Sequence, residues 1–209
     1  MPLTLPRFYP VIDHSIRPDL SLQQIARVLA GAGVRLVQLR AKQASGGALL
    51  AEAKELRSLL PPEVSLIVND RADVAQLSRA AGVHLGQDDL PVSVARRLLG
   101  PDKLIGFSTH NLEQIEAAAS APVDYLAFGP IFPTATKADT QPMVGCAGLR
   151  EVRKRTSKPL VAIGGITAAN AAQAIEAGAD SVAVISGWLA AEDIPARLEE
   201  FRSALGRLD

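Results

Sequence analysis

The segment VRLVQLRAK, residues 34–42, carries polar side chains at alternating positions, namely Gln38, Arg40 and Lys42. If the segment is an extended strand, the three side chains point to one side, because successive side chains alternate between the two faces. A guanidinium group and an ammonium group beside an amide are suited to binding a strongly anionic ligand. A solvent-exposed edge strand shows the same alternation, so the pattern by itself leaves both interpretations open.

Two aspartates follow apolar segments that lie one strand–helix repeat apart along the chain. Asp70 ends the segment SLIVND, and Asp89 follows the segment GVHLG. On neighbouring parallel strands the two carboxylates would lie close together, and such a pair, with water and phosphate oxygens, commonly binds Mg²⁺. Alternatively, each aspartate only caps the helix that follows it. A transition-metal site is poorly supported, because the three histidines and the single cysteine lack ligand spacing.

Glycines follow the apolar residues of two later segments, IGGIT and VAVISG. The first segment contains Gly165 and the second contains Ser186. A glycine between a strand and a helix leaves backbone N–H groups uncovered, and a phosphate bound there gains these donors together with the helix dipole. In a barrel of alternating strands and helices, the loops after the seventh and eighth strands are the recurrent phosphate site. The two segments therefore indicate a phosphate site, with ordinary turn glycines as the alternative.

The segment GPIFPTATK, residues 129–137, follows the apolar run YLAF. Its two prolines restrict the backbone, Thr134 and Thr136 offer hydroxyl groups, and Lys137 offers a positive charge. This composition predicts a lid over a phosphate group. Taken with the segments above, it indicates two anionic sites, one for a diphosphate with Mg²⁺ and one for a monophosphate.

These groups require a regular framework to bring them together. Short apolar or β-branched runs alternate with Ala- and Leu-rich segments of helical spacing, which predicts a parallel sheet. Eight repeats predict an α/β fold, a single-domain (β/α)8 TIM barrel spanning residues 1–209. An open doubly wound sheet is the alternative, although no GxGxxG motif follows the first run. The expected strands are residues 7–13, 34–40, 65–70, 82–86, 104–108, 125–129, 159–165 and 181–186. The clearest helical segments are residues 21–33, 47–60, 167–179 and 188–206.

The barrel interpretation also predicts which end of the sheet is functional. Active sites of such barrels lie at the C-terminal ends of the strands, where the polar groups described above are found. Asp124 and Asp180 instead begin strands, so we expect them to have structural roles. His84, inside GVHLG, is expected to be a packed or hydrogen-bonded strand residue, and Trp188 to pack the last helix against the barrel.

Length and composition exclude several classes of protein. A chain of 209 residues suffices for one packed core and is short for two domains. Its 22 basic and 22 acidic residues give no overall basic field for nucleic acid or an anionic membrane. Aromatic residues are only 4% of the chain, which argues against a base-stacking platform. The N-terminal segment MPLTLPRFYP has no apolar signal core and no run approaches the length of a membrane span, so we expect a cytoplasmic protein.

Seven motifs occur in order along nearly the whole chain: QLRAK, VNDRADVA, GVHLGQDDLP, GFSTH, FGPIFPTATK, IGGIT and VAVISG. This set resembles that of the thiamine-phosphate synthase family, and GPIFPTATK and HLGQDD are its most specific members. The resemblance implies a (β/α)8 barrel enzyme, a transferase that depends on Mg²⁺. Its substrates would be 4-amino-2-methyl-5-hydroxymethylpyrimidine diphosphate and 4-methyl-5-(2-hydroxyethyl)thiazole phosphate, and its products thiamine phosphate and diphosphate. The relatives also suggest a homodimer.

The resemblance assigns roles to individual residues. It implies that Asp70 and Asp89 are Mg²⁺ ligands. The residues implied to contact the pyrimidine diphosphate are Gln38, Arg40, Lys42, Asn69, Ser108 and Lys137. Those implied to hold the thiazole phosphate are Thr134, Thr136, Gly165, Ile185 and Ser186. The residues expected to take part directly in catalysis are Arg40, Lys42, Ser108 and Lys137.

In that family the diphosphate leaves first, and the thiazole nitrogen captures the resulting pyrimidine cation. The sequence fits this path, because no strong nucleophile or obvious general base stands out. One alternative is a thiazole tautomerase on the same barrel, which needs a base, for which His84 and His110 are the candidates at the barrel mouth. A tautomerase would have little reason to retain the residues predicted to bind the diphosphate and the metal. The other alternative is a binding protein that holds thiamine phosphate without turnover.

Overall fold

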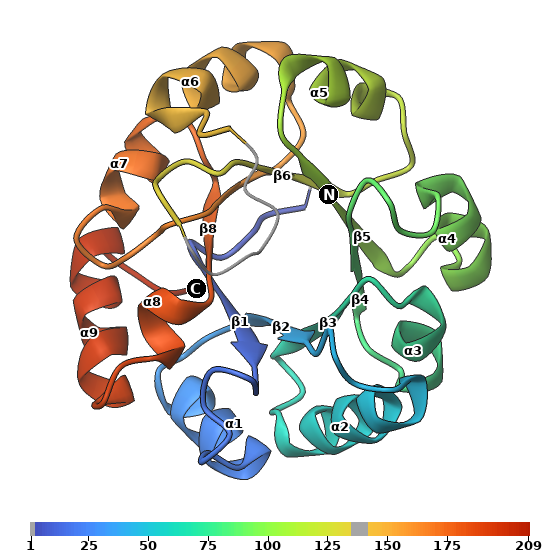
Figure 1. The fold of residues 1–209 in the computed structure, drawn as a ribbon, viewed down its shortest axis with the longest axis vertical. Coiled ribbons are helices and arrows are strands. Elements are labelled where there is room, and N and C mark those ends of the chain that lie inside the picture. The colour runs from blue at the N-terminus through green and yellow to red at the C-terminus, as the bar shows by residue number, and fades with distance from the viewer. Residues whose placement is uncertain (1–2, 135–141) are drawn as a thin grey trace.

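The strands form a closed parallel barrel in the order β1 to β8, with β8 pairing back to β1 (Figure 1). The structure is a computed structural model and describes residues 3–134 and 142–209. Closure of the sheet confirms the predicted (β/α)8 fold and excludes the open doubly wound alternative. The strands are β1 Phe8–Asp13, β2 Leu36–Arg40, β3 Ser65–Asn69, β4 Gly82–Leu85, β5 Leu104–Thr109, β6 Tyr125–Phe128, β7 Leu160–Ile163 and β8 Ser181–Val184.

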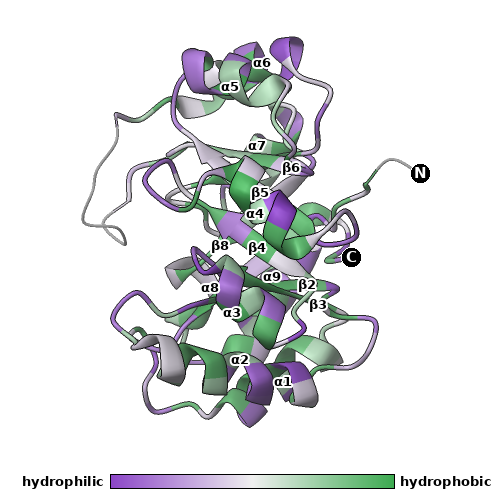
Figure 2. Ribbon diagram, turned by 90° about the vertical axis from the view of Figure 1, so that its right-hand side faces the viewer, coloured by the Kyte–Doolittle hydropathy of each residue, from purple (hydrophilic) through white to green (hydrophobic). Residues whose placement is uncertain are grey.

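Nine helices within the described residues surround the barrel. In Figure 2, helices such as α1 and α2 carry both hydrophilic and hydrophobic residues, as expected when one face packs on the sheet and the other meets solvent. None of the helices in the described ranges is long and apolar enough to cross a membrane. The helices are α1 Leu22–Gly31, α2 Gly46–Leu59, α3 Ala72–Leu77, α4 Val92–Leu99, α5 Leu112–Ala119, α6 Gly145–Arg155, α7 Ala171–Glu176, α8 Ser186–Leu189 and α9 Ile194–Leu205.

Side-chain caps begin four of the described helices, α1, α2, α5 and α9, and one of them corrects a prediction. The Ser21 hydroxyl accepts the Gln24 N–H while the Gln24 side chain accepts the Ser21 N–H, a capping box that starts α1 as expected. The expected single helix over residues 188–206 is wrong, because the structure divides it into α8 and α9. The Asp193 side chain accepts the N–H of Ala196 and a proline lies in the first turn, so a new helix begins there.

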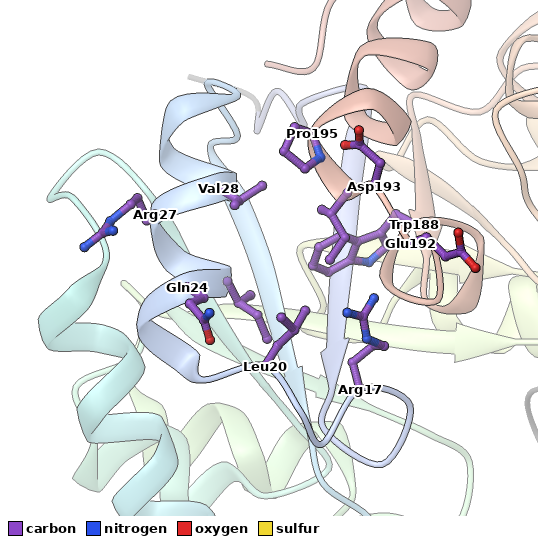
Figure 3. A pocket seen from close by; sticks show the side chains of 11 residues that line it. Arg17, Leu20, Gln24, Arg27, Val28, Trp188, Glu192, Asp193 and Pro195 are labelled. Carbon is purple, nitrogen blue, oxygen red and sulfur yellow. The ribbon is translucent and has the colours of Figure 1, made fainter.

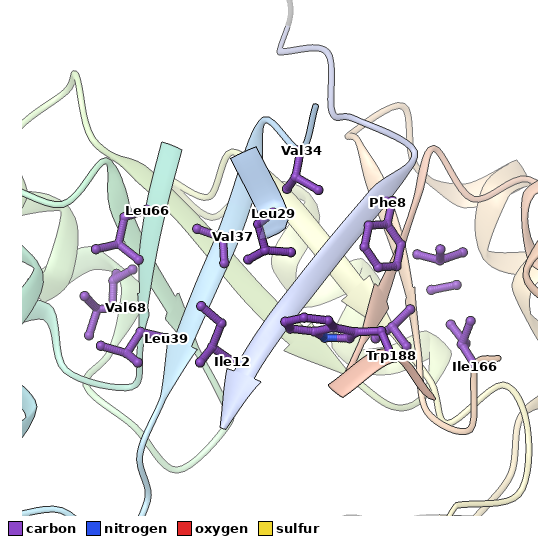
Figure 4. Close-up of a cluster of buried hydrophobic side chains, with 14 of the residues drawn as sticks. Phe8, Ile12, Leu29, Val34, Val37, Leu39, Leu66, Val68, Ile166 and Trp188 are labelled. Carbon is purple, nitrogen blue, oxygen red and sulfur yellow. The ribbon is translucent and has the colours of Figure 1, made fainter. Parts of the chain in front are cut away.

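The main hydrophobic core lies between the outer face of the barrel and the helices (Figure 4). Phe8 and Ile12 on β1 point into this layer, and the Phe8 ring packs at a tilt against Phe201 of α9, with ring centroids 4.7 Å apart. Trp188 of α8 is fully buried in it, and its indole N–H donates to the Val11 carbonyl over 3.2 Å. Trp188 therefore packs against the barrel as expected, but it belongs to α8 and not to the last helix, α9.

A second, smaller core fills the inside of the barrel. Alternate residues of the strands point inward, and Tyr9, Leu36, Ile67, Tyr125 and Val161 form one buried cluster there. The period of two along each strand produces this separation, because neighbouring side chains leave the sheet on opposite faces. The barrel is therefore a packed unit whose open surface for ligands is its C-terminal end.

The opposite end, where the strands begin, is held by two aspartates that serve the backbone. Asp124 accepts the N–H of Ile105 over 2.7 Å and a guanidinium N–H of Arg96 over 2.5 Å. Asp180 accepts the backbone N–H of Leu160 over 2.8 Å and pairs with an arginine of α6 over 3.0 Å. Both aspartates thus tie neighbouring strands to a covering helix, which confirms their predicted structural roles.

Candidate active site at the barrel mouth

Those of the predicted diphosphate residues that the structure describes lie at one end of the barrel. Gln38 and Arg40 are near the end of β2, Asn69 ends β3 and Ser108 is next to last in β5. Because all eight strands are parallel in a closed sheet, these ends surround a single mouth. Lys42 follows β2 in the adjoining loop. The structure therefore brings together groups that are far apart in the sequence.

Arg40 is held in place by a buried aspartate. Its guanidinium group donates to the carboxylate of Asp13, which ends the neighbouring strand β1 and is only 4% exposed. The other carboxylate oxygen of Asp13 accepts the N–H of Ser15 over 3.1 Å and its hydroxyl over 2.6 Å. Sequence reasoning missed Asp13, although its place at the end of the first apolar run was a usable signal.

The two predicted metal ligands lie beside each other after β3 and β4. Asp70 has φ +64°, a left-handed conformation that is uncommon for a residue other than glycine, and its N–H donates to the His84 carbonyl over 2.8 Å. Its carboxylate forms an ion pair with Lys42 at 2.5 Å. The Asp89 carboxylate accepts the N–H of Gly86 over 2.6 Å. Asp70 and Asp89 both line a pocket of about 410 Å³.

The electrostatics of this pair suit a divalent cation. Burial raises the pKa of the Asp89 carboxyl above its usual range, and the hydrogen bond that Asp89 shares with Asp70 and the negative charge of Asp70 raise it further. A bound cation would relieve that repulsion. Within the described ranges no group of three or more His, Cys, Asp or Glu residues could hold a metal ion. Two carboxylates with room for other oxygen ligands fit Mg²⁺ better than a metal that needs a full set of protein ligands.

The start of the lid segment packs on the loop after β7. The N–H of Ile131 donates to the Ile163 carbonyl over 2.8 Å, and that of Phe132 to the Gly164 carbonyl over 3.1 Å. Gly165 has φ +64°, and a Cβ there would lie 2.3 Å from the carbonyl oxygen of Pro133. Glycine is therefore required for this close approach. The contact brings Thr134 to the side of the mouth where the loop after β7 lies. The predicted residues Thr136 and Lys137 lie outside the described ranges.

The loops after β7 and β8 adjoin as well. A Cβ on Gly187 would lie 2.3 Å from the Ile166 carbonyl oxygen, so the two backbones are in contact there. Ile185 precedes the short helix α8, whose first residue is Ser186. Gly165, Ile185 and Ser186 thus occupy neighbouring loops, as the prediction of a phosphate site requires.

A chain of buried hydrogen bonds crosses the barrel beneath the mouth. The Gln38 amide Nε2 donates to the Tyr9 hydroxyl over 3.0 Å, and the hydroxyls of Tyr9 and Tyr125 are 2.9 Å apart. The Tyr125 hydroxyl lies 3.1 Å from His84 Nδ1, and His84 Nε2 lies 2.9 Å from the Ser108 hydroxyl. The expectation that His84 is a hydrogen-bonded strand residue is confirmed. Sequence reasoning missed the tyrosines, because only barrel closure places them side by side.

His110 has a structural place at the end of β5. Its Nδ1 lies 2.7 Å from the Gly129 carbonyl oxygen, which accepts the hydrogen. Its backbone N–H donates to the Gln114 side chain over 2.7 Å. The ring therefore fastens the end of β5 to the beginning of the segment after β6.

A further pocket of about 470 Å³ lies on the flank of the barrel, between α1 and the α8–α9 region (Figure 3). Leu20, Val28 and Trp188 supply apolar surface, and Arg17 and Glu192 lie at its edge. None of the described site residues lines this pocket. The mouth of the barrel, rather than this larger hollow, is therefore where the candidate chemistry is concentrated.

The fold and the mouth define a class: (β/α)8 barrel proteins whose mouth carries cationic side chains beside a pair of carboxylates. Comparison with known proteins narrows that class. The family model described as thiamine monophosphate synthase matches residues 8–188. The chain therefore belongs to the thiamine monophosphate synthase family, which confirms the resemblance seen in the motifs.

Individual relatives are similar over nearly their whole length. The chain is 50% identical to a thiamine-phosphate synthase of Koribacter versatilis over 97% of each chain. It is 46% identical to the one of Chloroflexus aurantiacus, over 94% of this chain and 91% of that protein. Among solved structures, the thiamine phosphate pyrophosphorylase from Pyrococcus furiosus superposes with a TM-score of 0.86 at 33% identity, covering 96% of this chain and 95% of that one.

Proposed function

We propose that this protein is a transferase that catalyses the thiamine-phosphate synthase reaction. It joins 4-amino-2-methyl-5-hydroxymethylpyrimidine diphosphate to 4-methyl-5-(2-hydroxyethyl)thiazole phosphate and releases diphosphate. The observation that carries the proposal is the near full-length identity to curated synthases, in a chain whose mouth holds Arg40 and Lys42 together with Asp70 and Asp89.

The bond changes need charge stabilisation more than proton transfer. The bond from the pyrimidine methylene carbon to the diphosphate oxygen breaks, and its electron pair leaves with the diphosphate. The thiazole nitrogen then gives its lone pair to that carbon. Arg40, held by Asp13, supplies a fixed positive charge at the leaving group, and Lys42 supplies a second one nearby. Preorganised charges of this kind stabilise a transition state in which negative charge develops.

Mg²⁺ fits the pair Asp70 and Asp89 by ligand chemistry and by the repulsion between their carboxyl groups. When bound, it would offset negative charge on the diphosphate. Lys42, now paired with Asp70, would then be available to the diphosphate oxygens. Asn69 and the remaining predicted contacts, Gln38, Ser108 and Lys137, would position the pyrimidine end of the substrate.

The thiazole phosphate is proposed to bind at the loops after β6, β7 and β8. Support comes from Gly165, whose positive φ and contact with Pro133 bring the start of the lid to the phosphate loop. Thr134, Thr136 and Ser186 would offer hydroxyl donors, and Gly165 and Ile185 backbone groups. Holding the acceptor beside the pyrimidine makes the transfer effectively intramolecular.

The test is a direct assay of the purified protein with both substrates and Mg²⁺, following thiamine phosphate by its fluorescent oxidation product. We expect product that disappears when the metal is removed by a chelator. No product from intact substrates would contradict the proposal and favour the tautomerase or the binding protein. The single domain over residues 1–209, the homodimer and the cytoplasmic location stay predictions.

A further inference from the structure

The chain of hydrogen bonds beneath the mouth connects two of the predicted substrate contacts, Gln38 and Ser108. Between them lie Tyr9, Tyr125 and His84, none of which has a role in the reaction proposed above. Both end residues are buried, with 5% and 7% of their surface exposed. The direction of the hydrogen bonds inside the chain therefore also determines whether each end residue donates a hydrogen bond to a ligand or accepts one.

Space for this chain is provided by a glycine. A Cβ on Gly106 would lie 2.1 Å from Cζ of Tyr125, 2.3 Å from its hydroxyl oxygen and 2.5 Å from His84 Nδ1. Real Cβ atoms do not approach so closely, so only glycine on β5 admits the phenol and the imidazole together. Tyr9 and Tyr125 also meet edge to face, with ring centroids 6.1 Å apart. The chain is thus fixed by packing as well as by its hydrogen bonds.

The direction of the hydrogen bonds follows from counting hydrogens. The Gln38 amide N–H donates to the Tyr9 oxygen, so the single hydroxyl hydrogen of Tyr9 goes to the Tyr125 oxygen. Tyr125 then uses its own hydrogen on His84 Nδ1, which must carry a lone pair. Burial raises the pKa of both phenols well above the usual value, so both keep their hydrogens. A buried hydrogen without an acceptor would be costly, which disfavours mixed directions.

The ends of the chain acquire opposite characters. With a lone pair on Nδ1, the hydrogen of His84 resides on Nε2 and is donated to the Ser108 oxygen. The hydroxyl hydrogen of Ser108 is not used by the chain and can be donated to a ligand. At the other end, the Gln38 amide turns its Nε2 to Tyr9, which leaves its carbonyl oxygen as an acceptor.

We propose that Tyr9, Tyr125 and His84 are positioning residues that fix Gln38 as a hydrogen-bond acceptor and Ser108 as a donor. The mouth then selects a pyrimidine that donates from an amino group and accepts at a ring nitrogen. An oxo pyrimidine offers a carbonyl and a ring N–H instead, the reverse polarity. The inference rests on the proposed function, because it concerns the pyrimidine substrate of the same site.

The first test is spectroscopic and independent of turnover. In protein labelled with ¹⁵N-histidine, long-range proton–nitrogen spectra report which ring nitrogen of His84 carries the hydrogen, and loss of the signal in a His84→Asn variant assigns it. We expect the hydrogen on Nε2, and a shift toward the other tautomer in Tyr125→Phe, where Nδ1 loses its donor. A hydrogen on Nδ1 in the unaltered protein would overturn the inference.

The second test measures selectivity. Dissociation constants of the amino pyrimidine diphosphate and its oxo analogue are compared by calorimetry in the unaltered protein and in Tyr125→Phe. We expect the preference for the amino compound to fall by about tenfold in the variant, as for the loss of one buried hydrogen bond. Tyr9→Phe breaks the chain at another link and should act in the same direction, which covers the case that Tyr125→Phe folds poorly.

The matched control is Thr109→Val, because Thr109 is fully buried on the same strand as Ser108 and donates to the Ala127 carbonyl over 2.8 Å outside the chain. It should lose stability without changing the selectivity or the His84 tautomer. Equal binding of both pyrimidines by the unaltered protein, or equal changes in Thr109→Val and Tyr125→Phe, would contradict the inference alone. If neither pyrimidine binds and the assay yields no thiamine phosphate, the proposed function itself fails.

Discussion

The two ends of the barrel both pair aspartates with cationic side chains, but the surroundings of these pairs differ. Where the strands begin, Asp124 serves a backbone N–H of β5 as well as Arg96. Where the strands end, Asp70 pairs with Lys42, and the negative charge of Asp70 raises the pKa of the nearby Asp89 carboxyl. Carboxylates at the first end are committed to holding strands together. Asp70 and Asp89 at the mouth are instead crowded against each other, an arrangement that suits a bound cation.

The largest expected effect comes from Arg40. Arg40→Gln should reduce kcat/KM by about 10²–10³-fold, because a fixed charge at the leaving group is lost. It should also destabilise the protein by about 3–5 kcal/mol, because the buried Asp13 carboxylate loses its partner. Steady-state kinetics and urea unfolding measure the two effects separately.

A double variant separates charge from folding. Asp13→Asn together with Arg40→Gln removes both members of the buried pair and should recover much of the lost stability. Activity should stay low, because the leaving group still lacks its cation. If activity recovered together with stability, Arg40 would have only a structural role. Its role would then be the same as that of Asp124 and Asp180 at the other end of the barrel.

The next effect concerns the phosphate side of the mouth. Gly165→Ala should raise the KM for the thiazole phosphate at least about tenfold, because the left-handed backbone is strained with a side chain and the new Cβ would collide with the Pro133 carbonyl. Gly31→Ala is the control, since a Cβ at this helix residue meets no atom within 4 Å. Similar kinetics for the two variants would remove Gly165 from the substrate site.

The smallest effect on activity is expected at the end where the strands begin. Asp124→Asn weakens the bonds to Ile105 and Arg96 and should lower the free energy of unfolding by about 1–3 kcal/mol. Below the temperature at which the variant unfolds, kcat and both KM values should be unchanged. A large fall in kcat for this variant would contradict the purely structural role assigned to the end where the strands begin.

The fold was predictable because the chain repeats one local pattern. Strand and helix periodicity alternate throughout, and the closed barrel follows from eight such repeats. The break between α8 and α9 was missed, since an apolar helical pattern covers residues 188–206 and only the cap at Asp193 and the proline that follows it at position 195 interrupt this pattern. Helix boundaries depend on such single side chains more than on periodicity.

The candidate site was predictable in part for a related reason. Polar residues at strand ends are visible in the sequence, so Arg40 and Asp70 could be named as candidates for the site. Their partners could not, because pairing with Asp13 or placing Tyr9 against Tyr125 depends on which strands become neighbours. A tyrosine in an apolar run looks like core, and only the closed barrel turns its hydroxyl toward another polar group.

The most direct measurement compares one aspartate from each end in the same assay. Asp70→Asn and Asp180→Asn are each examined for thiamine phosphate formation across a range of Mg²⁺ concentrations, with circular dichroism to confirm folding. We expect Asp70→Asn to lose activity by about 10²-fold or more and to need more Mg²⁺, while Asp180→Asn keeps its turnover and metal dependence. Full activity in Asp70→Asn, or an equal loss in both variants, would contradict the assignment of the mouth as a metal-assisted active site.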